Sequence, residues 1–291
     1  MFSARENRAV GGLLGLVVAS EALATGQVNR YQLRTKYTKL YRNVYVLRDL
    51  RLDAALRARA AWHWSGREAV VVGNSAAALL GSRWIPAGIP AELARVRSRA
   101  PAGIVVYSGA IACDETRLVG DIACTTSPRT AYDLGRRLSL DTAIARIDAL
   151  LNATGATVEE VRRIAARYPG ARHVRRLRSA LDLVDGGAES PQETRLRLVL
   201  VRGGLPRPVT QIRVDHRRID MRYPKWFVGV EYDGEQHWTD PKIYADDIER
   251  LEFLAAQGWT IVRVSGRQLR DDPGGVVRRV RQTLRQAGCA A

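Results

Sequence analysis

The chain has 291 residues, 46% of them hydrophobic, which is enough for two or three domains with cores of their own. It carries 46 Lys and Arg against 30 Asp and Glu, a formal charge of +16, and such an excess favours nucleic acid or another polyanion as partner. No run approaches the ~20 apolar residues of a membrane helix, and the three cysteines, without CxxC spacing, exclude a disulfide framework or a zinc site.

The first residues imitate a secretory signal, with Arg5 and Arg8 before an apolar run. Three glycines break that run, and Glu21 intrudes before the supposed cleavage site. We therefore expect a cytoplasmic protein with reduced thiols, and a helix over residues 7–19 in place of a signal.

Residues 1–50 are predicted to form a winged helix-turn-helix. A short helix over 21–25 ends at Gly26, Asn29 caps a third helix over 30–36, and strands over 39–41 and 44–47 form the wing. Side chains of the types that contact base edges and phosphates lie on the third helix and the wing: Arg30, Tyr31, Gln32, Arg34, Lys36, Lys39 and Arg42. We predict that they contact DNA; the alternative is a solvated basic face.

Residues 51–151 are predicted to form a small α/β module. The expected helices cover 50–64, 76–80 with Asn74 or Ser75 as cap, 130–138 opened by Ser127-Pro128, and 141–151. The expected strands cover 70–72, 91–96, 103–107 and 121–125. Nothing in this module has the pattern of a catalytic site, so we interpret it as a spacer, an oligomerisation module or a sensing module.

Four segments of this half are similar to AbiEi-type antitoxins: residues 27–33, 40–45, 73–79 and 127–134. In that family a winged helix precedes a small α/β domain. The resemblance covers about residues 7–150 and implies a transcriptional autorepressor, with a cognate toxin as a possible partner.

Residues 152–186 are predicted to form a basic helical connector. A capping box, Thr157 with Glu160, opens a helix to about Arg167, and a second helix covers 171–185. The two helices carry Arg162, Arg163, Arg167, Arg172, Arg175, Arg176 and Arg178. This cluster either follows a phosphate backbone or is only solvated. A boundary is expected at Gly186-Gly187.

Residues 187–291 are predicted to form one further domain. Ser190 caps a helix to about 202, with Glu193 completing a capping box. A strand with a bulge is expected over 209–221, a buried strand over 227–230, a helix over 244–256, a strand over 259–264 and a helix over 275–287.

Carboxylates gather at the end of the buried strand. If the preceding turn centres on residues 225–226, Asp220 lies opposite Glu231, and Asp233 projects from the same face. Three converging carboxylates repel one another unless a cation or protons intervene. The sequence thus predicts a divalent-metal site; the alternative is ordinary strand-end acids and Asp-Gly turn chemistry.

The order of these elements resembles the PD-(D/E)XK nucleases and, more narrowly, their very-short-patch-repair-like branch. The resemblance is carried by residues 218–220, 230–237, 247–250 and 258–264. It implies a mixed central sheet flanked by helices, Asp220 and Glu231 as ligands of Mg²⁺ or Mn²⁺, Glu193 as the helix glutamate of the fold, and His237 as the histidine that assists catalysis.

The chain departs from the family at Asp233, where the pattern has lysine. The lysine's task of positioning water must pass to His237 or Gln236, or be lost. Asp247 and Arg250 either support the metal ligands or form an ordinary surface pair one helical turn apart.

From these observations we expect an α/β protein that binds DNA and cleaves it as an Mg²⁺-dependent endonuclease, in defence, repair or a toxin–antitoxin setting. One alternative is a non-enzymatic DNA-binding regulator whose nuclease fold has lost turnover. Another is an RNA-cleaving toxin.

Overall fold

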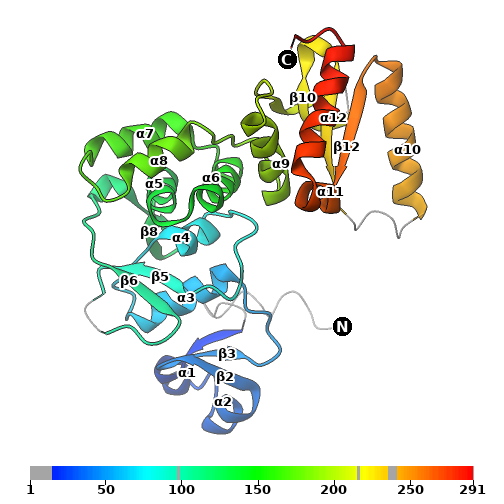
Figure 1. The fold of residues 1–291 in the computed structure, drawn as a ribbon. Helices are drawn as coiled ribbons and strands as arrows, with labels where there is room; N and C mark the ends of the chain where they lie inside the picture. The colour runs from blue at the N-terminus through cyan, green and yellow to red at the C-terminus, as the bar shows by residue number, and fades with distance from the viewer. Residues whose placement is uncertain (1–14, 97–98, 215–216, 235–240, 291) are drawn as a thin grey trace. The chain divides into compact units, whose positions relative to one another are not determined.

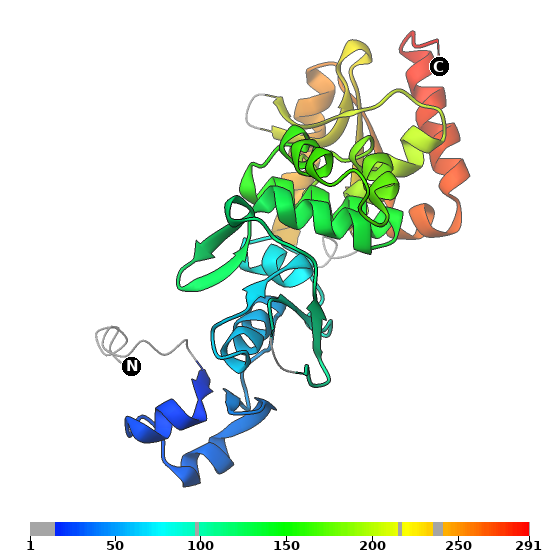
Figure 2. The same cartoon turned by 90° about the vertical axis from the view of Figure 1, so that its left-hand side faces the viewer.

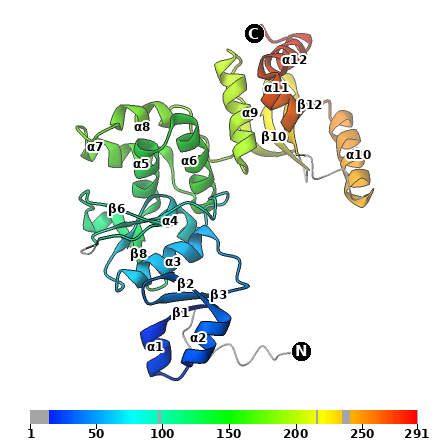
Figure 3. The same cartoon turned by 60° about the horizontal axis from the view of Figure 1, so that its bottom comes forward.

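The computed structural model describes residues 15–96, 99–214, 217–234 and 241–290. The chain divides into two compact units, residues 1–134 and 135–291, which Figures 1, 2 and 3 trace from three directions. Its strands form one antiparallel and two mixed sheets, with helices around them, so the predicted mixed α/β class is confirmed. No described helix is long and apolar enough to cross a membrane.

The first unit begins with a small antiparallel sheet in the order β1-β3-β2. Its elements are β1 (Leu16–Val18), α1 (Ala19–Ala24), α2 (Arg30–Lys36), β2 (Tyr37–Tyr41) and β3 (Val44–Leu47). The predicted start of α2 is confirmed, because the Asn29 side chain accepts a hydrogen bond from the Gln32 amide at 2.8 Å and the Gln32 side chain accepts one from the Asn29 amide.

The helix expected over residues 7–19 is wrong at its end. Residues 16–18 form β1, which pairs with β3, and Gly15 precedes them with φ +87°, a conformation that no helix continues through. The β-branched residues Val17 and Val18 favour the strand. Residues 7–14 lie outside the described part of the chain.

A five-stranded sheet in the order β6-β5-β4-β8-β7 forms the rest of this unit. The strands are β4 (Val70–Val71), β5 (Ala91–Ala94), β6 (Ile104–Tyr107), β7 (Thr116–Val119) and β8 (Ile122–Thr125). The helices are α3 (Ala54–Trp64), α4 (Gly73–Leu79) and α5 (Ser127–Arg137), whose last residues belong to the second unit. Helix α4 begins earlier than expected, so Asn74 lies in its first turn. The buried Glu92 carboxylate, and not a local cap, accepts the Asn74 amide.

The second unit contains α6 (Leu140–Thr154), α7 (Val158–Arg167) and α8 (Val174–Leu181). The Thr157–Glu160 capping box of α7 is confirmed. Helix α8 is shorter than the expected 171–185, because the chain turns through residues 169–172 and His173 takes a left-handed φ of 64° before the helix begins.

Buried polar contacts fasten these helices to the C-terminal part of the chain. Asp148 Oδ2 and Arg197 Nη2 lie 2.6 Å apart with both side chains only 1% exposed, and Asp148 also accepts from Thr194 Oγ1 at 2.8 Å. Arg197 further donates to the Leu183 carbonyl at 2.5 Å, and Arg207 donates to the Asp182 carbonyl at 3.1 Å. Residues 152–186 therefore belong to the same compact unit as the last sheet. The predicted domain boundaries stay predictions.

The last sheet has the order β12-β11-β10-β9. Its strands are β9 (Val209–Val214), β10 (Arg217–Tyr223), β11 (Val228–Asp233) and β12 (Thr260–Ser265). Strands β9, β10 and β11 are antiparallel neighbours, and β12 runs parallel to β11. The single bulged strand expected over 209–221 is wrong, since Arg217 pairs back with Val214 to make a hairpin.

Helices cover both faces of this sheet (Figure 3). Helices α9 (Pro191–Arg202), α11 (Gly266–Asp271) and α12 (Pro273–Gln286) share one apolar cluster with β11 and β12. Helix α10 (Pro241–Ala256) packs on the opposite face, where Leu254 meets Ile219 and Trp259. Helix α11 was not expected from the sequence.

Candidate active site

The hairpin of β10 and β11 positions the predicted acids. The turn Pro224–Trp226 sets the expected register, with Tyr223 opposite Val228 and Met221 opposite Val230. This regular pairing includes Met221–Val230 but not the expected pair Asp220–Glu231. The Asp220 carboxylate instead accepts a hydrogen bond from the Tyr232 amide at 3.0 Å.

Asp220 is not paired with Glu231 because the side chains of β10 stop alternating regularly between the two faces of the sheet at this point. Ile219 packs with Leu254 of α10, whereas Met221 packs in the cluster on the opposite face. Residues two apart in a regular strand face the same side, so β10 breaks its alternation at Asp220. The sequence pattern carried no sign of this break.

Glu231 is held by an arginine from α10. Arg250 Nη1 lies 2.6 Å from Glu231 Oε1, and Nη2 lies 2.8 Å from Oε2, so the guanidinium binds both carboxylate oxygens. Glu231 is only 7% exposed, and a forked pair of this kind satisfies a buried carboxylate better than a single contact. The hydrogen bond with Glu231, against the effect of desolvation, raises the pKa of Arg250 above its usual value.

The chain of charges continues beyond Arg250. Its Nη2 lies 2.8 Å from Asp247 Oδ1, and Arg263 Nη1 of β12 lies 2.8 Å from Asp247 Oδ2. Arg263 Nη2 in turn lies 3.0 Å from Asp233 Oδ2. The acids therefore alternate with two arginines along the sheet end, Glu231–Arg250–Asp247–Arg263–Asp233, instead of converging on one point. Asp247 and Arg250 are part of this network and more than a surface pair.

Glu193 lies at the start of α9 and has a local role. Its backbone amide donates to the Ser190 hydroxyl at 3.1 Å, while its carboxylate accepts from the Glu189 amide at 2.9 Å and not from Ser190, so the expected capping box is incomplete. Arg218 of β10 pairs with the Glu189 carboxylate. Sequence reasoning missed Glu189, Arg218 and Arg263, because nothing in the local pattern links them to the acids.

Asp220 is the most perturbed acid of the site. Burial, followed by the nearby Glu193 carboxylate, raises its pKa to about 7, and Glu231 adds to this rise. The Tyr232 amide and the Arg218 charge oppose it. Like charges near one buried carboxyl produce such a shift. Asp220, Glu193 and Glu231 therefore share one electrostatic environment.

The grouping of the acids and the kind of donor atoms they offer both bear on whether this site can hold a metal ion. Among the described residues, no three His, Cys, Asp or Glu side chains are grouped so that they enclose a metal ion. The donors that are present are oxygens only, and Asp233 Oδ1 is buried without a hydrogen-bond partner in the described part of the chain. Oxygen-only sets of one or two carboxylates completed by water suit Mg²⁺. The donor elements suit a hydrated divalent cation, while both carboxylate oxygens of Glu231 are already bound by Arg250.

The remaining predicted residues lie elsewhere. Gln236 and His237 lie outside the described residues, so their predicted roles stay predictions. The other residues predicted to contact DNA are all exposed in the first unit, and their role stays a prediction: Arg30, Tyr31 (67% exposed), Arg34, Lys36, Lys39 and Arg42. The Gln32 side chain serves the cap of α2.

The part of the chain that contains the last sheet matches a known protein family. Residues 193–284 match the family model REase_MTES_1575, a restriction-endonuclease-like family. This C-terminal part is a restriction-endonuclease-like domain.

Two proteins of Mycobacterium tuberculosis resemble a larger part of the chain. They are named "Uncharacterized protein Rv2248" (strain ATCC 25618 / H37Rv) and "Uncharacterized protein MT2308" (strain CDC 1551 / Oshkosh), and each is 30% identical over 200 residues, 67% of this chain and 73% of the relative. The chain belongs to the family of these two proteins. No solved structure matches it.

Proposed function

We propose that this protein is a metal-dependent endonuclease that hydrolyses phosphodiester bonds of DNA in the cytoplasm. The observation that carries the proposal is the acid pair Asp220 and Glu231 on two adjacent strands of a restriction-endonuclease-like sheet, with Glu231 fixed by Arg250. Defence, repair or a toxin–antitoxin system is the setting in which such an enzyme would act.

Asp220 and Glu231 would hold Mg²⁺ or Mn²⁺, with Glu193 close enough to influence the charge of Asp220. When bound, the metal supplies charge neutralisation at the phosphate and a more acidic water. Arg250 holds the Glu231 carboxylate in one orientation, and the Tyr232 amide does the same for Asp220. A ligand fixed in advance loses little further freedom when the metal binds.

Asp233 does not take over the task of the missing lysine in this proposal. Its Oδ2 is paired with Arg263 and it offers no proton donor comparable to an ammonium. We assign the positioning of water and the transfer of its proton to His237, with Gln236 as a neighbouring donor. Imidazole titrates near neutral pH, as this step requires.

DNA reading belongs, in this proposal, to the first unit. Helix α2 is exposed on its basic side and is followed by the β2–β3 hairpin, the order of parts in a winged helix. Lys39 and Arg42 of the hairpin are exposed and available to phosphates.

A second candidate is a DNA-binding regulator without turnover. The observation that favours it is that both oxygens of Glu231 are occupied by Arg250, while the lysine position holds Asp233. In this case the C-terminal domain binds DNA but does not cleave it.

One experiment separates these candidates. Purified full-length protein is incubated with supercoiled plasmid, a duplex oligonucleotide and RNA, each with Mg²⁺, Mn²⁺ or EDTA. The nuclease proposal expects DNA cleavage with metal and none in EDTA. If no substrate is cut in any metal while duplex DNA is bound, the protein is the regulator. Cleavage of RNA alone would identify an RNA-cleaving toxin.

A further inference from the structure

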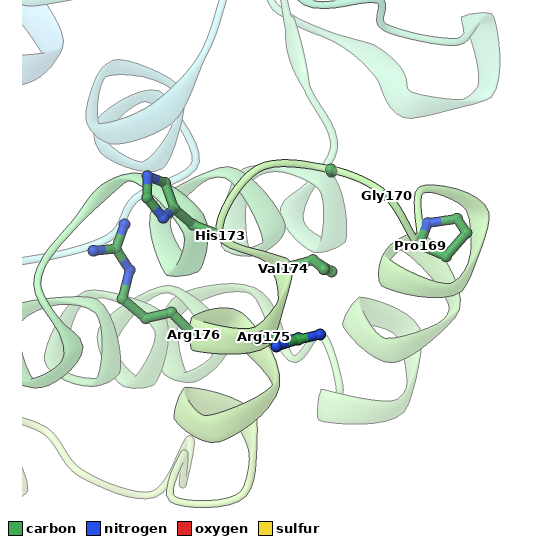
Figure 4. A pocket seen from close by; sticks show the side chains of 7 residues that line it. Pro169, Gly170, His173, Val174, Arg175 and Arg176 are labelled. Atoms are coloured by element: carbon green, nitrogen blue, oxygen red, sulfur yellow. The ribbon is translucent and has the colours of Figure 1, made fainter.

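A pocket of about 500 Å³ lies where the chain passes from α7 to α8 in the second unit. It is lined by Pro169, Gly170, Ala171, His173, Val174, Arg175 and Arg176 (Figure 4). None of the lining residues is acidic. Among the described residues that line it, the ionisable side chains are therefore two guanidinium groups and an imidazole.

Further positive charges surround the same place. Beyond desolvation, the charges of Arg176, Arg172 and Arg136 lower the pKa of His173. In Figure 4 the His173 ring and the Arg176 guanidinium lie on the same side of the pocket. Cations that gather closely enough to disfavour one another's charge create a positive potential, which an anion relieves.

Some arginines of this unit are engaged in ion pairs, whereas Arg172 and Arg175 beside the pocket are not, in the part of the chain that the structure describes. Arg162, Arg202 and Arg218 form ion pairs with Asp182, Asp141 and Glu189. Arg172 and Arg175 are both exposed, and within the described residues their side chains form no ion pair or hydrogen bond. Their charge is not used to hold the fold, so it remains available to a ligand.

Backbone contacts fix the pocket wall. Arg136 Nη1 donates to the Arg172 carbonyl at 2.9 Å, and Arg176 donates to the Arg136 carbonyl. His173 is held with a left-handed φ of 64°. Arg136 and Arg176 therefore hold the backbone in position, whereas the side chains of Arg172 and Arg175 make no such contact with any described residue.

We propose that this pocket binds a phosphate of the DNA backbone, with Arg175 of the pocket wall and the neighbouring Arg172, whose charge acts on the lining residue His173, as the contacting side chains. The choice of DNA rests on the proposed function. It is supported by the fastening of α6 and α8 to the restriction-endonuclease-like domain through Asp148–Arg197 and Arg207, which makes the pocket a fixed part of the same compact unit. Arginine forks suit phosphate oxygens, and such contacts position a protein on DNA without reading its sequence.

The test measures binding without cleavage. Affinity of the full-length protein for a fluorescently labelled duplex is followed by anisotropy in EDTA over a range of salt concentrations. The double variant Arg172→Gln/Arg175→Gln should bind more weakly at every salt concentration, and the slope of log K against log salt should fall by about 2, since each phosphate contact contributes about 1.

A matched control removes the same charge elsewhere. Arg267→Gln/Arg278→Gln takes away two arginines that are 83% and 72% exposed but lie beside Asp271 and Asp272 at 3.7 and 3.5 Å. This variant should keep the salt slope of the natural protein. Both double variants should keep the thermal melting curve, because neither loses a buried contact.

Three outcomes overturn the proposal. The first is an unchanged affinity and slope for Arg172→Gln/Arg175→Gln. The second is an equal loss in the Arg267/Arg278 control, which would show a general charge effect. The third is a loss of binding to RNA but not to DNA. Because the assay contains no metal, weakened binding by the double variant supports the pocket even if the natural protein cleaves nothing.

Discussion

Arg250 binds both carboxylate oxygens of Glu231, at 2.6 and 2.8 Å, across the gap between a helix and a buried strand. The pair is largely shielded from water, with side-chain exposures of 20% and 9%. Burying an unpaired carboxylate in such surroundings costs folding free energy, whereas an arginine that binds both of its oxygens compensates for the lost hydration.

Arg250→Ala should therefore destabilise the protein by about 3 kcal/mol, because it leaves Glu231 buried without a countercharge. Urea unfolding of the full chain measures the change, and Arg250→Lys should lose less, since it keeps the charge but not the fork. The control is Arg267→Ala, an exposed partner of Asp271, which should change stability by no more than about 0.5 kcal/mol. Equal stability of the Arg250 and Arg267 variants would contradict the prediction.

Asp220→Asn and Glu231→Gln should each abolish cleavage and leave DNA binding largely intact. Both replacements keep the size of the side chain but remove the negative charge that would hold the metal. Cleavage is measured on plasmid in Mg²⁺, and binding on the labelled duplex in EDTA. Either variant cutting at the wild-type rate would show that the metal ligands lie elsewhere.

His237→Ala should lower the cleavage rate roughly 10²–10⁴-fold with little change in affinity, the range expected for loss of a general acid–base group. The motive is the position of His237 four residues beyond Asp233, just past Gly234. Single-turnover cleavage measures the chemical step apart from binding. An unchanged rate would leave the nuclease in place but move proton transfer to another residue.

Asp148→Ala should destabilise the second unit by about 3–5 kcal/mol, because it leaves the buried Arg197 guanidinium without its partner. Asp141→Ala is the control: Asp141 also pairs with an arginine, but the two side chains are 63% and 43% exposed, and such pairs contribute about 0–1 kcal/mol. The urea concentration at the midpoint of unfolding is measured for both variants and should be clearly lower for Asp148→Ala. Equal midpoints would contradict the prediction.

Gly229→Ala tests the packing behind the acids. A Cβ at Gly229 would lie 2.5 Å from Ile261 Cδ1 and 2.9 Å from Ile219 Cγ2, so the strands or the isoleucines must move, at a cost of about 1–3 kcal/mol. Gly88→Ala, where nothing lies within 4 Å, should leave the melting temperature nearly unchanged. An equally stable Gly229→Ala would show that this core has room to adjust.

Helix caps and tight turns could be predicted from the sequence, because the residues that form them are close together in the chain. The Asn29 cap of α2, the Thr157–Glu160 box of α7 and the register of the β10–β11 hairpin all depend on residues close in sequence, and all three are confirmed. Strands β1 and β7 were missed because each is defined by its pairing with a partner strand, β3 and β8 respectively. Residue propensities carry no information about that partner.

The acids of the candidate site were found from the sequence, but their partners were not. Arg250 was considered only with Asp247, and its contact with Glu231 spans 19 positions. Arg263 reaches Asp233 because β12 runs parallel to β11 with Arg263 beside Glu231. Such pairs depend on which strand lies next to which, and a single sequence does not state this.

The parallel pairing of β12 with β11 also has a consequence for synthesis. Translation produces Glu231 and Asp233 first, then Arg250 in α10, and Arg263 only near the end of the chain. Until β12 is made and docked, Asp233 lacks its arginine and Asp247 has only one of its two. A chain that ends between Asp247 and Arg263 therefore carries every acid of the site without the full set of arginines that neutralises them.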